Sequence, residues 1–94
     1  MAVEEVVYQA FEERFGEAPN HFASHGWDAI SLLVKAIEDA QDTKPDAIAA
    51  ALNAISGFAG ADGIFNYSPT NHDGLAVDDL IMVEIEDASW VLAQ

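Results

Sequence analysis

The sequence of 94 residues contains no cysteine, which excludes disulfide bonds and any chemistry that depends on a thiol. It also has no apolar run close to the roughly 20 residues that a membrane-spanning helix requires. The opening stretch, MAVEEVV, is acidic and so differs from the basic start of a secretory signal peptide. Since 51% of the residues are hydrophobic, we expect one packed domain over residues 1–94 rather than a disordered chain.

Basic residues are as scarce as acidic ones are plentiful. The sequence has 17 acidic residues but only three basic ones, Arg14, Lys35 and Lys44, so the formal net charge is −14. A chain with so few cations has no basic patch to follow a phosphate backbone, which argues against nucleic acid as a partner. Attraction to anionic membranes is disfavoured for the same reason. We interpret the acidity as a solvated surface that keeps molecules apart.

No arrangement of residues typical of an enzyme is recognisable. Ser24 precedes His25 directly, but adjacency in sequence does not make a nucleophile and its base. The passage GFAGADG follows a predicted helix, whereas a phosphate-binding glycine loop follows a strand. We therefore predict that the protein is not an enzyme and uses no cofactor.

Two candidate metal sites are incomplete. His21 and His25 are spaced i and i+4, so both imidazoles could reach one ion, but no third ligand is obvious nearby. The oxygen-rich stretches 66–74 and 73–79 lack the glycine and glutamate positions of a calcium-binding loop. We therefore predict no metal site.

The stretch 20–40 predicts one long helix, with Asn20 as its N-cap. Its apolar residues recur at the spacing of a helical face, namely Ile30, Leu33, Val34 and Ile37. Its clear polar edge consists of Asp28, Ser31, Lys35, Glu38 and Asp39. A helix that is apolar over most of its circumference must be buried by several neighbours, so we expect the rest of the chain to surround it.

Two further helices are predicted on either side of this one. Residues 3–15 form the first, and Gly16 ends it. The third follows Gln41-Asp42, where Thr43 and Asp46 resemble a capping box, and it ends at Gly57.

After Gly57 the hydrophobic pattern changes to that of strands. We predict a short strand over 64–67, a loop over 68–74 and a longer strand over 80–85. Residues 86–89 form a turn, and residues 90–92 return as the partner strand. The predicted fold class is therefore α/β, with three helices followed by a short strand and a C-terminal β-hairpin. An acyl carrier protein is rejected, because the nearest match to its Asp-Ser-Leu site is Asp73-Gly74-Leu75, which has no serine.

Several short motifs follow one another in a recognisable order. At the start of the central helix they are Phe22-Ala23 and Trp27-Asp28-Ala29, and elsewhere Phe11, Phe15-Gly16, Pro19, Gly60, Gly63, Tyr67-Ser68-Pro69, His72-x-Gly74 and Trp90-Val91-Leu92. Together they resemble the periplasmic substrate-binding proteins of branched-chain amino acid ABC transporters, with Trp27 in place of the usual tyrosine. The terminal turn departs from the family's Asp-Gly-Lys, since it reads Asp87-Ala88-Ser89.

The resemblance implies a C-terminal fragment of a periplasmic-binding-protein fold, in which a ligand lies between two α/β lobes joined by three crossovers. The chain would supply the final part of the first lobe, the last crossover and the terminal strands. The intact parent would bind a branched-chain amino acid or a similar small organic solute in the periplasm and deliver it to an ABC permease. Its signal peptide would lie outside this chain.

The resemblance also implies ligand-binding residues. In the family the residue that matches Phe22 contacts the ligand's side chain, which suits an aromatic wall at the mouth of a pocket. The alternative is that Phe22 is simply the first core residue of the helix. His25 and Gly26 are neighbouring candidates for ligand binding. Trp27 is expected to serve packing, and Asp28 to hold a neighbouring backbone or arginine.

A second interpretation is a free-standing acidic α/β module that binds other proteins through exposed apolar helix faces. An upstream reading frame with a signal peptide would favour the fragment, and a stable monomer would favour the module. Because the strands that would cover the central helix are not in the sequence, we expect the isolated chain to form a homo-oligomer, most simply a symmetric dimer.

Overall fold

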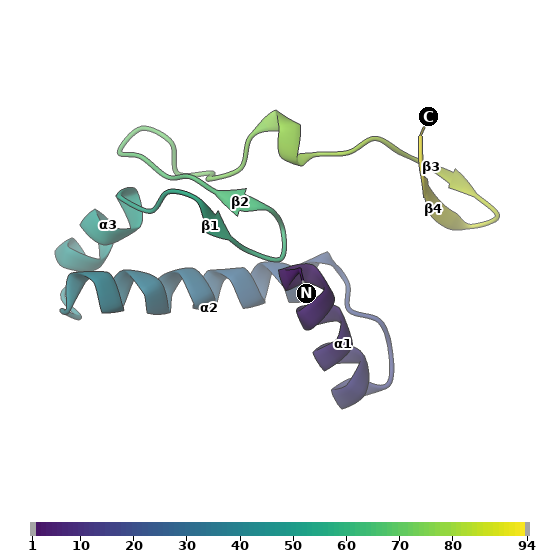
Figure 1. Cartoon of the computed structure of the whole chain (residues 1–94), viewed down its shortest axis with the longest axis horizontal. Helices are drawn as coiled ribbons and strands as arrows, with labels where there is room; N and C mark the ends of the chain where they lie inside the picture. The colour runs from purple at the N-terminus through teal and green to yellow at the C-terminus, as the bar shows by residue number, and fades with distance from the viewer. Residues whose placement is uncertain (1, 94) are drawn as a thin grey trace.

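The computed structural model describes residues 2–93, over which three α-helices, a short 3-10 helix and two pairs of strands follow one another (Figure 1). In chain order they are α1 (Val3–Phe15), α2 (His21–Ala40), α3 (Pro45–Asn53), β1 (Phe58–Ala59), β2 (Ile64–Phe65), η1 (Val77–Asp79), β3 (Val83–Glu86) and β4 (Ser89–Leu92). This order confirms the predicted fold class. None of these helices is long and apolar enough to cross a membrane.

The overall shape is elongated. The Cα radius of gyration is 15.6 Å, whereas a compact domain of 100 residues has about 13 Å. Figure 1 shows α2 along the long axis, α1 turning away from its start, and α3 with the β1–β2 pair lying over its other side. The β3–β4 hairpin stands apart from all of these at the far end of the molecule.

Both ends of α2 lie where local chemistry favours them. The side chain of Asn20 accepts hydrogen bonds from the backbone N–H groups of Phe22 and Ala23, at 3.0 and 3.2 Å, which confirms it as the N-cap. Such a cap contributes about 1 kcal/mol. At the other end Gln41 takes a left-handed conformation with φ 52°, and its N–H returns to the carbonyl of Ile37.

Helix α1 has the bounds predicted from the sequence. Gly16 adopts φ 74° and donates its N–H to the carbonyl of Glu12, the left-handed termination that glycine permits at low cost. Only Val7 of this helix is buried. Helix α1 is therefore attached to the rest of the chain along a narrow contact near the start of α2.

The predicted capping box of α3 is wrong. The helix begins at Pro45 with Lys44 as N-cap, and no side chain caps it. Proline fixes φ at a helical value and needs no hydrogen-bond acceptor at the first position of a helix, so it moves the start past Thr43. The nearby carboxylate of Asp42 instead accepts from the N–H of Lys44 at 3.0 Å.

Helix α3 also ends earlier than predicted, at Asn53, and a short strand that was not predicted from the sequence, β1, follows at Phe58–Ala59. β1 pairs antiparallel with β2, with Phe58 opposite Phe65. The predicted strand 64–67 keeps only its first two residues. The side chain of Asn66 accepts from the N–H of Gly57 at 2.8 Å, so a polar side chain takes over the pairing that a longer strand would have made.

The core lies on one side of α2. Its buried residues are Leu32, Ile55 and Phe65, and packed against them are Leu52, Phe58, Tyr67 and Leu75. Helix α2 buries only Asp28, Leu32 and Ala36. The expectation that neighbours in the chain cover most of this helix is wrong, because its other face stays exposed and Ile30 is 63% accessible.

The exposed face of α2 is a continuous apolar strip. We use this term for the exposed residues Trp27, Ile30, Leu33 and Val34. They lie at the i, i+3, i+6 and i+7 positions of one helical side, opposite Leu32. The hydrophobic pattern of the sequence correctly places Ile30, Leu33 and Val34 on one face of the helix. It does not show that the rest of the chain leaves this face uncovered.

The C-terminal hairpin has a regular ladder. β3 pairs antiparallel with β4, with Glu86 opposite Ser89, and the connecting residues Asp87 and Ala88 have φ of 51° and 63°. Two positive φ values in a two-residue connection are typical of a type I′ turn, whose twist suits a hairpin. The strand begins at Val83, so the first three residues of the predicted strand 80–85 lie outside it.

Candidate functional site

The three candidate ligand-binding residues lie in the first two turns of α2. Phe22 is 69% exposed, so it is not a core residue of this chain. Its ring centroid lies 4.0 Å from that of His21 and 6.4 Å from that of His25, the latter edge-on at 89°. The space beside Gly26 is open, because a Cβ atom built there would have no neighbour within 4 Å.

A turn from a distant part of the chain lies against this helix start. Residues 60–63 connect β1 to β2, and the side chain of Asp62 reaches back to α2. Its Oδ1 accepts from the hydroxyl of Ser24 at 2.6 Å, and its Oδ2 lies 2.5 Å from Nδ1 of His25. Sequence reasoning missed Asp62, because nothing in a single sequence links two segments 37 positions apart.

Asp28 fixes the backbone of the same turn. Its two carboxylate oxygens accept from the N–H groups of Ala61 at 2.7 Å and Asp62 at 2.8 Å. The side chain is only 2% exposed, so its assignment to the polar, solvated edge of the helix is wrong. The other expectation for Asp28, that it holds a neighbouring backbone, agrees with these two hydrogen bonds.

Gly60 allows this close approach. A Cβ atom at this position would lie 2.8 Å from Oδ1 of Asp28 and 2.8 Å from the ring of Phe65. Any larger residue would therefore push the turn away from the helix. Gly60 itself was a sequence signal for a close approach, but it did not indicate that the neighbour is the carboxylate of Asp28.

Ser24 has one hydroxyl proton and two acceptors within reach. Besides Oδ1 of Asp62, the carbonyl of His21 lies at 2.8 Å. An ionised carboxylate is the stronger acceptor, so we assign the proton to the bond with Asp62. The turn at residues 60–63 is thus held from three positions on the same side of α2, namely Ser24, His25 and Asp28. We call these three residues, together with Asp62, the α2 clamp.

The electrostatics of the clamp favour an ionised Asp62. Burial raises the pKa of its carboxyl group, but hydrogen bonds with Ser24 and His25 and the charge of the His25 ring together outweigh burial. The pKa of Asp62 is therefore lowered from its ordinary value of 3.8. At neutral pH the carboxylate is a pure hydrogen-bond acceptor.

Beside the clamp the surface is hollowed over about 280 Å³. Leu32, Phe65 and Leu75 form an apolar floor, and His25, Asp62, Tyr67 and Asp73 stand around it. Burial, followed by the negative charges of Asp28 and Asp73, raises the pKa of the Tyr67 hydroxyl. The hollow is thus an apolar surface with a negative rim.

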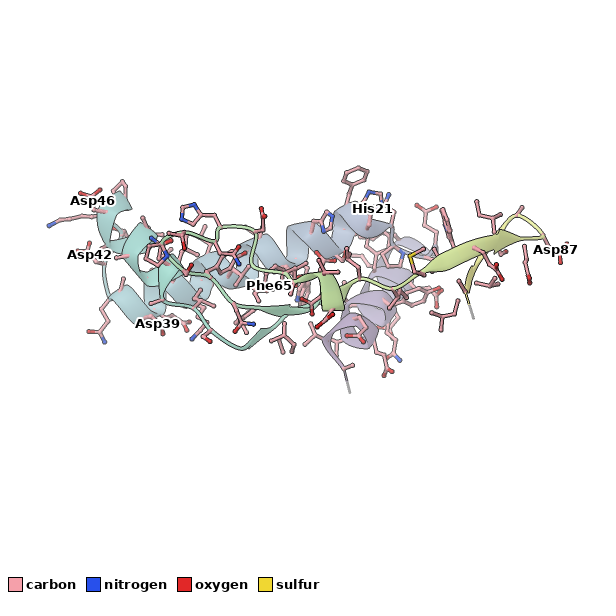
Figure 2. The ribbon with its side chains drawn as sticks, turned by 90° about the horizontal axis from the view of Figure 1, so that it is seen from above. His21, Asp39, Asp42, Asp46, Phe65 and Asp87 are labelled. Atoms are coloured by element: carbon pink, nitrogen blue, oxygen red, sulfur yellow. The ribbon has the colours of Figure 1, made fainter. Side chains whose placement is uncertain are left out.

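The clamp does not contain a serine–histidine pair. Ser24 and His25 both bond to Asp62 rather than to each other, so His25 is not placed to take the proton of the Ser24 hydroxyl. Within residues 2–93 no group of three or more potential ligands converges on a metal position. Figure 2 shows His21 at one end of α2, and Asp39, Asp42 and Asp46 together at the other end.

A sequence model described as "Periplasmic binding protein" matches residues 5–89 of the chain. No curated protein matches the sequence significantly. Several solved structures are similar over nearly the whole chain. A protein of Rhodopseudomonas palustris strain CGA009 has a TM-score of 0.80 at 24% identity, over 99% of this chain and 29% of its own length.

Two further similar structures are those of ligand-binding proteins. An extracellular ligand-binding receptor from Rhodopseudomonas palustris HaA2 has a TM-score of 0.78 at 26% identity, over 92% of this chain and 26% of its own. The leucine binding protein LivK from Thermotoga maritima has a TM-score of 0.75 at 24% identity, over 98% and 25%. The chain thus spans little more than a quarter of the length of the solved proteins that it resembles.

Proposed function

Because the chain belongs to the periplasmic binding protein family, we propose that it is the C-terminal part of a two-lobed solute-binding protein that captures a small amino acid outside the cytoplasm. Branched-chain amino acids are the proposed ligand class. The intact protein would pass its ligand to an ABC permease and would carry out no chemistry. The proposed ligand-binding residues are Phe22, with His25 and Gly26 beside it.

The observation that carries the proposal is the exposed ring of Phe22 on a helix start that is otherwise firmly held. A large aromatic side chain that is 69% accessible loses hydrophobic stabilisation unless something covers it. The Asn20 cap below it and the α2 clamp beside it fix the backbone that carries the ring. A fixed aromatic surface at an open edge is what an apolar ligand side chain needs for selective binding.

The exposed apolar surfaces support the idea that the chain is a fragment. The apolar strip on α2 has no charged residue among its members, and large exposed patches of this kind are rare on soluble monomers. In the proposed parent this strip would lie on the parallel sheet of the first lobe. The similar solved proteins are several times longer, which leaves ample chain to supply that sheet.

The separate C-terminal hairpin supports a second lobe. Residues 75–82 lead away from the core with only the short helix η1 in between, and β3–β4 lies beyond them (Figure 1). Every residue of the hairpin strands is exposed except Val91, which is half-buried. We propose that residues 75–82 form the last crossover and that the hairpin belongs to the other lobe.

Calorimetric titration of the full-length protein with L-leucine, L-isoleucine and L-valine tests the proposal. We expect a dissociation constant in the micromolar range or tighter for at least one of them. If a folded full-length protein binds another small solute but none of these three, the proposed ligand class is wrong and the receptor function stands. If the gene encodes no longer product, the free-standing interaction module becomes the better interpretation.

A further inference from the structure

We propose that Asp62 is a positioning residue for the ligand site: it holds His25 in the tautomer that carries its proton on Nδ1, so that Nε2 accepts a hydrogen bond from an ammonium group of the ligand beside Phe22. The inference deepens the function proposed above and rests on it, because it requires a ligand at the start of α2. It assigns a role to Asp62, which neither the sequence motifs nor the family resemblance singled out.

The tautomer follows from the contact between Asp62 and His25. A neutral imidazole has one N–H donor and one acceptor nitrogen. Oδ2 of Asp62 lies 2.5 Å from Nδ1 of His25, and an ionised carboxylate can only accept. Nδ1 must therefore carry the proton, and Nε2 of the neutral ring is left with a free lone pair.

The carboxylate is held so that it cannot turn away from the ring. Its second oxygen is bonded to Ser24 at 2.6 Å, and its own backbone N–H is bonded to Asp28 at 2.8 Å. Asp28 is buried and also accepts from Ala61. Both the side chain and the backbone of Asp62 are thus fixed on α2, which fixes the orientation of the His25 ring in turn.

The outer edge of the His25 ring is available to a ligand. The side chain is 57% exposed, and over residues 2–93 the contact with Asp62 is its only side-chain hydrogen bond. The ring of Phe22 stands edge-on to it with centroids 6.4 Å apart. A ligand whose apolar part covers Phe22 would therefore have its polar end close to the His25 ring.

The surrounding charges select the kind of polar group. The titratable side chains that face the His25 ring are Asp62 at its Nδ1, Asp28, Asp73 and Tyr67 around the adjoining hollow, and His21 one turn earlier on the same helix. The carboxylates among them attract a positive group and repel a negative one. A free Nε2 lone pair in this field suits a ligand ammonium rather than a ligand carboxylate.

The first test measures the tautomer directly in the 94-residue chain. Nitrogen-15 NMR of the imidazoles distinguishes a protonated Nδ1 from a protonated Nε2. At pH 8 we expect His25 to carry its proton on Nδ1, and we expect Asp62→Ala to return it to the Nε2–H form that free histidine prefers. Asp73→Ala is the matched control, because Asp73 lines the same hollow without a bond to His25. A wild-type ring protonated on Nε2 overturns the proposal by itself, even if the Asp62→Ala chain fails to fold.

The second test measures L-leucine binding by the full-length protein. We expect Asp62→Ala and His25→Ala each to weaken binding about tenfold, the loss of one hydrogen bond to a charged group, and Asp73→Ala to change it far less.

The two tests separate the inference from the function on which it rests. If the wild-type protein binds no leucine while the tautomer is as expected, the proposed ligand is wrong and the positioning role of Asp62 stands. If leucine binds with normal affinity to both Asp62→Ala and His25→Ala, the proposed function stands and the inference is wrong.

Discussion

The carboxylate of Asp28 accepts a hydrogen bond of 2.8 Å from the backbone N–H of Asp62, 34 positions further along the chain. Its other oxygen accepts from the neighbouring N–H of Ala61. One buried side chain from α2 therefore satisfies two backbone groups of a turn that would otherwise leave them without acceptors away from water. The turn between β1 and β2 is built on Asp28, and the clamp residues act on a backbone that is already fixed.

Replacing Asp28 should release this turn. Asp28→Asn keeps the shape of the side chain but turns one acceptor into an NH₂ donor that faces a backbone N–H. We expect the free energy of unfolding to fall by about 1–3 kcal/mol, seen as a lower urea midpoint with an unchanged slope. Glu38→Gln, on an exposed part of the same helix, is the matched control and should change the stability by less than about 0.5 kcal/mol. Equal midpoints for the two variants would show that Asp28 does not hold the turn.

Asp62 should stabilise the fold near neutral pH and lose this effect in acid. Because its folded-state pKa is lowered, the ionised group stabilises the fold above its ordinary pKa of 3.8, and this contribution disappears as the pH falls below that value through the folded-state pKa. Asp62→Asn should therefore have a lower urea midpoint than the wild type at pH 6, and the gap should be smaller at pH 3, below the ordinary pKa of 3.8. A gap of the same size at both pH values would contradict the lowered pKa.

Phe22→Ala in the full-length protein should weaken ligand binding and leave the fold intact. Loss of an aromatic wall costs on the order of 1–3 kcal/mol of affinity if the ring contacts an apolar ligand group. Phe15→Ala removes an equally bulky ring that is 59% exposed on α1, away from the clamp, and should leave affinity unchanged. Thermal melts and ligand titrations on the same samples separate the roles. A collapsed melting temperature with normal residual affinity would make Phe22 a core residue of the parent.

The 94-residue chain alone should not bind branched-chain amino acids with useful affinity. An open half-site leaves the ligand's carboxylate and ammonium in water, so little offsets the entropy lost on association. Calorimetry with leucine, isoleucine and valine is the measurement. A micromolar or tighter constant for any of them would mean that the chain holds a complete pocket, and the two-lobed parent would no longer be needed.

The isolated chain should self-associate, most simply as a symmetric dimer. The apolar strip on α2 and the open edges of β3–β4 are the surfaces that a second copy would cover. The net charge of −14 opposes association, so added salt should strengthen it by screening the repulsion. Light scattering at low and high salt measures this, and Ile30→Glu, which places a charge in the strip, should shift the chain towards monomer. A wild-type monomer in both buffers would show that the strip needs no partner.

Local rules predicted the helices well, because each rule acts within a few residues. Asn20 and the hydrophobic pattern placed α2, and Gly16 placed the end of α1, since a cap and a left-handed stop involve only near neighbours. The start of α3 failed where two local signals competed. The capping-box pattern at Thr43 was outweighed by the fixed φ of Pro45, two residues further on.

The site was harder to predict, because its geometry depends on contacts between distant segments. The family motifs directed attention to Phe22 and His25, whose roles as ligand contacts stay predictions. They gave no indication of Asp62, which meets His25 only after the chain has folded back over α2. Asp28 was misplaced for a related reason: an acid on a helix normally faces water, and only the N–H groups of a turn from elsewhere make its burial favourable.

Because the β3–β4 hairpin lies apart from the helical body, we expect the two parts to unfold independently, each with its own free energy of unfolding. A two-stranded hairpin without a covering layer is marginally stable in water, whereas the helical body has its own core of Leu32, Ile55 and Phe65. Amides in β3 and β4 should therefore exchange with solvent through openings that leave α2 intact. A melting curve followed by helical circular dichroism consequently measures the body alone and carries no information about whether the last ten or so residues are folded.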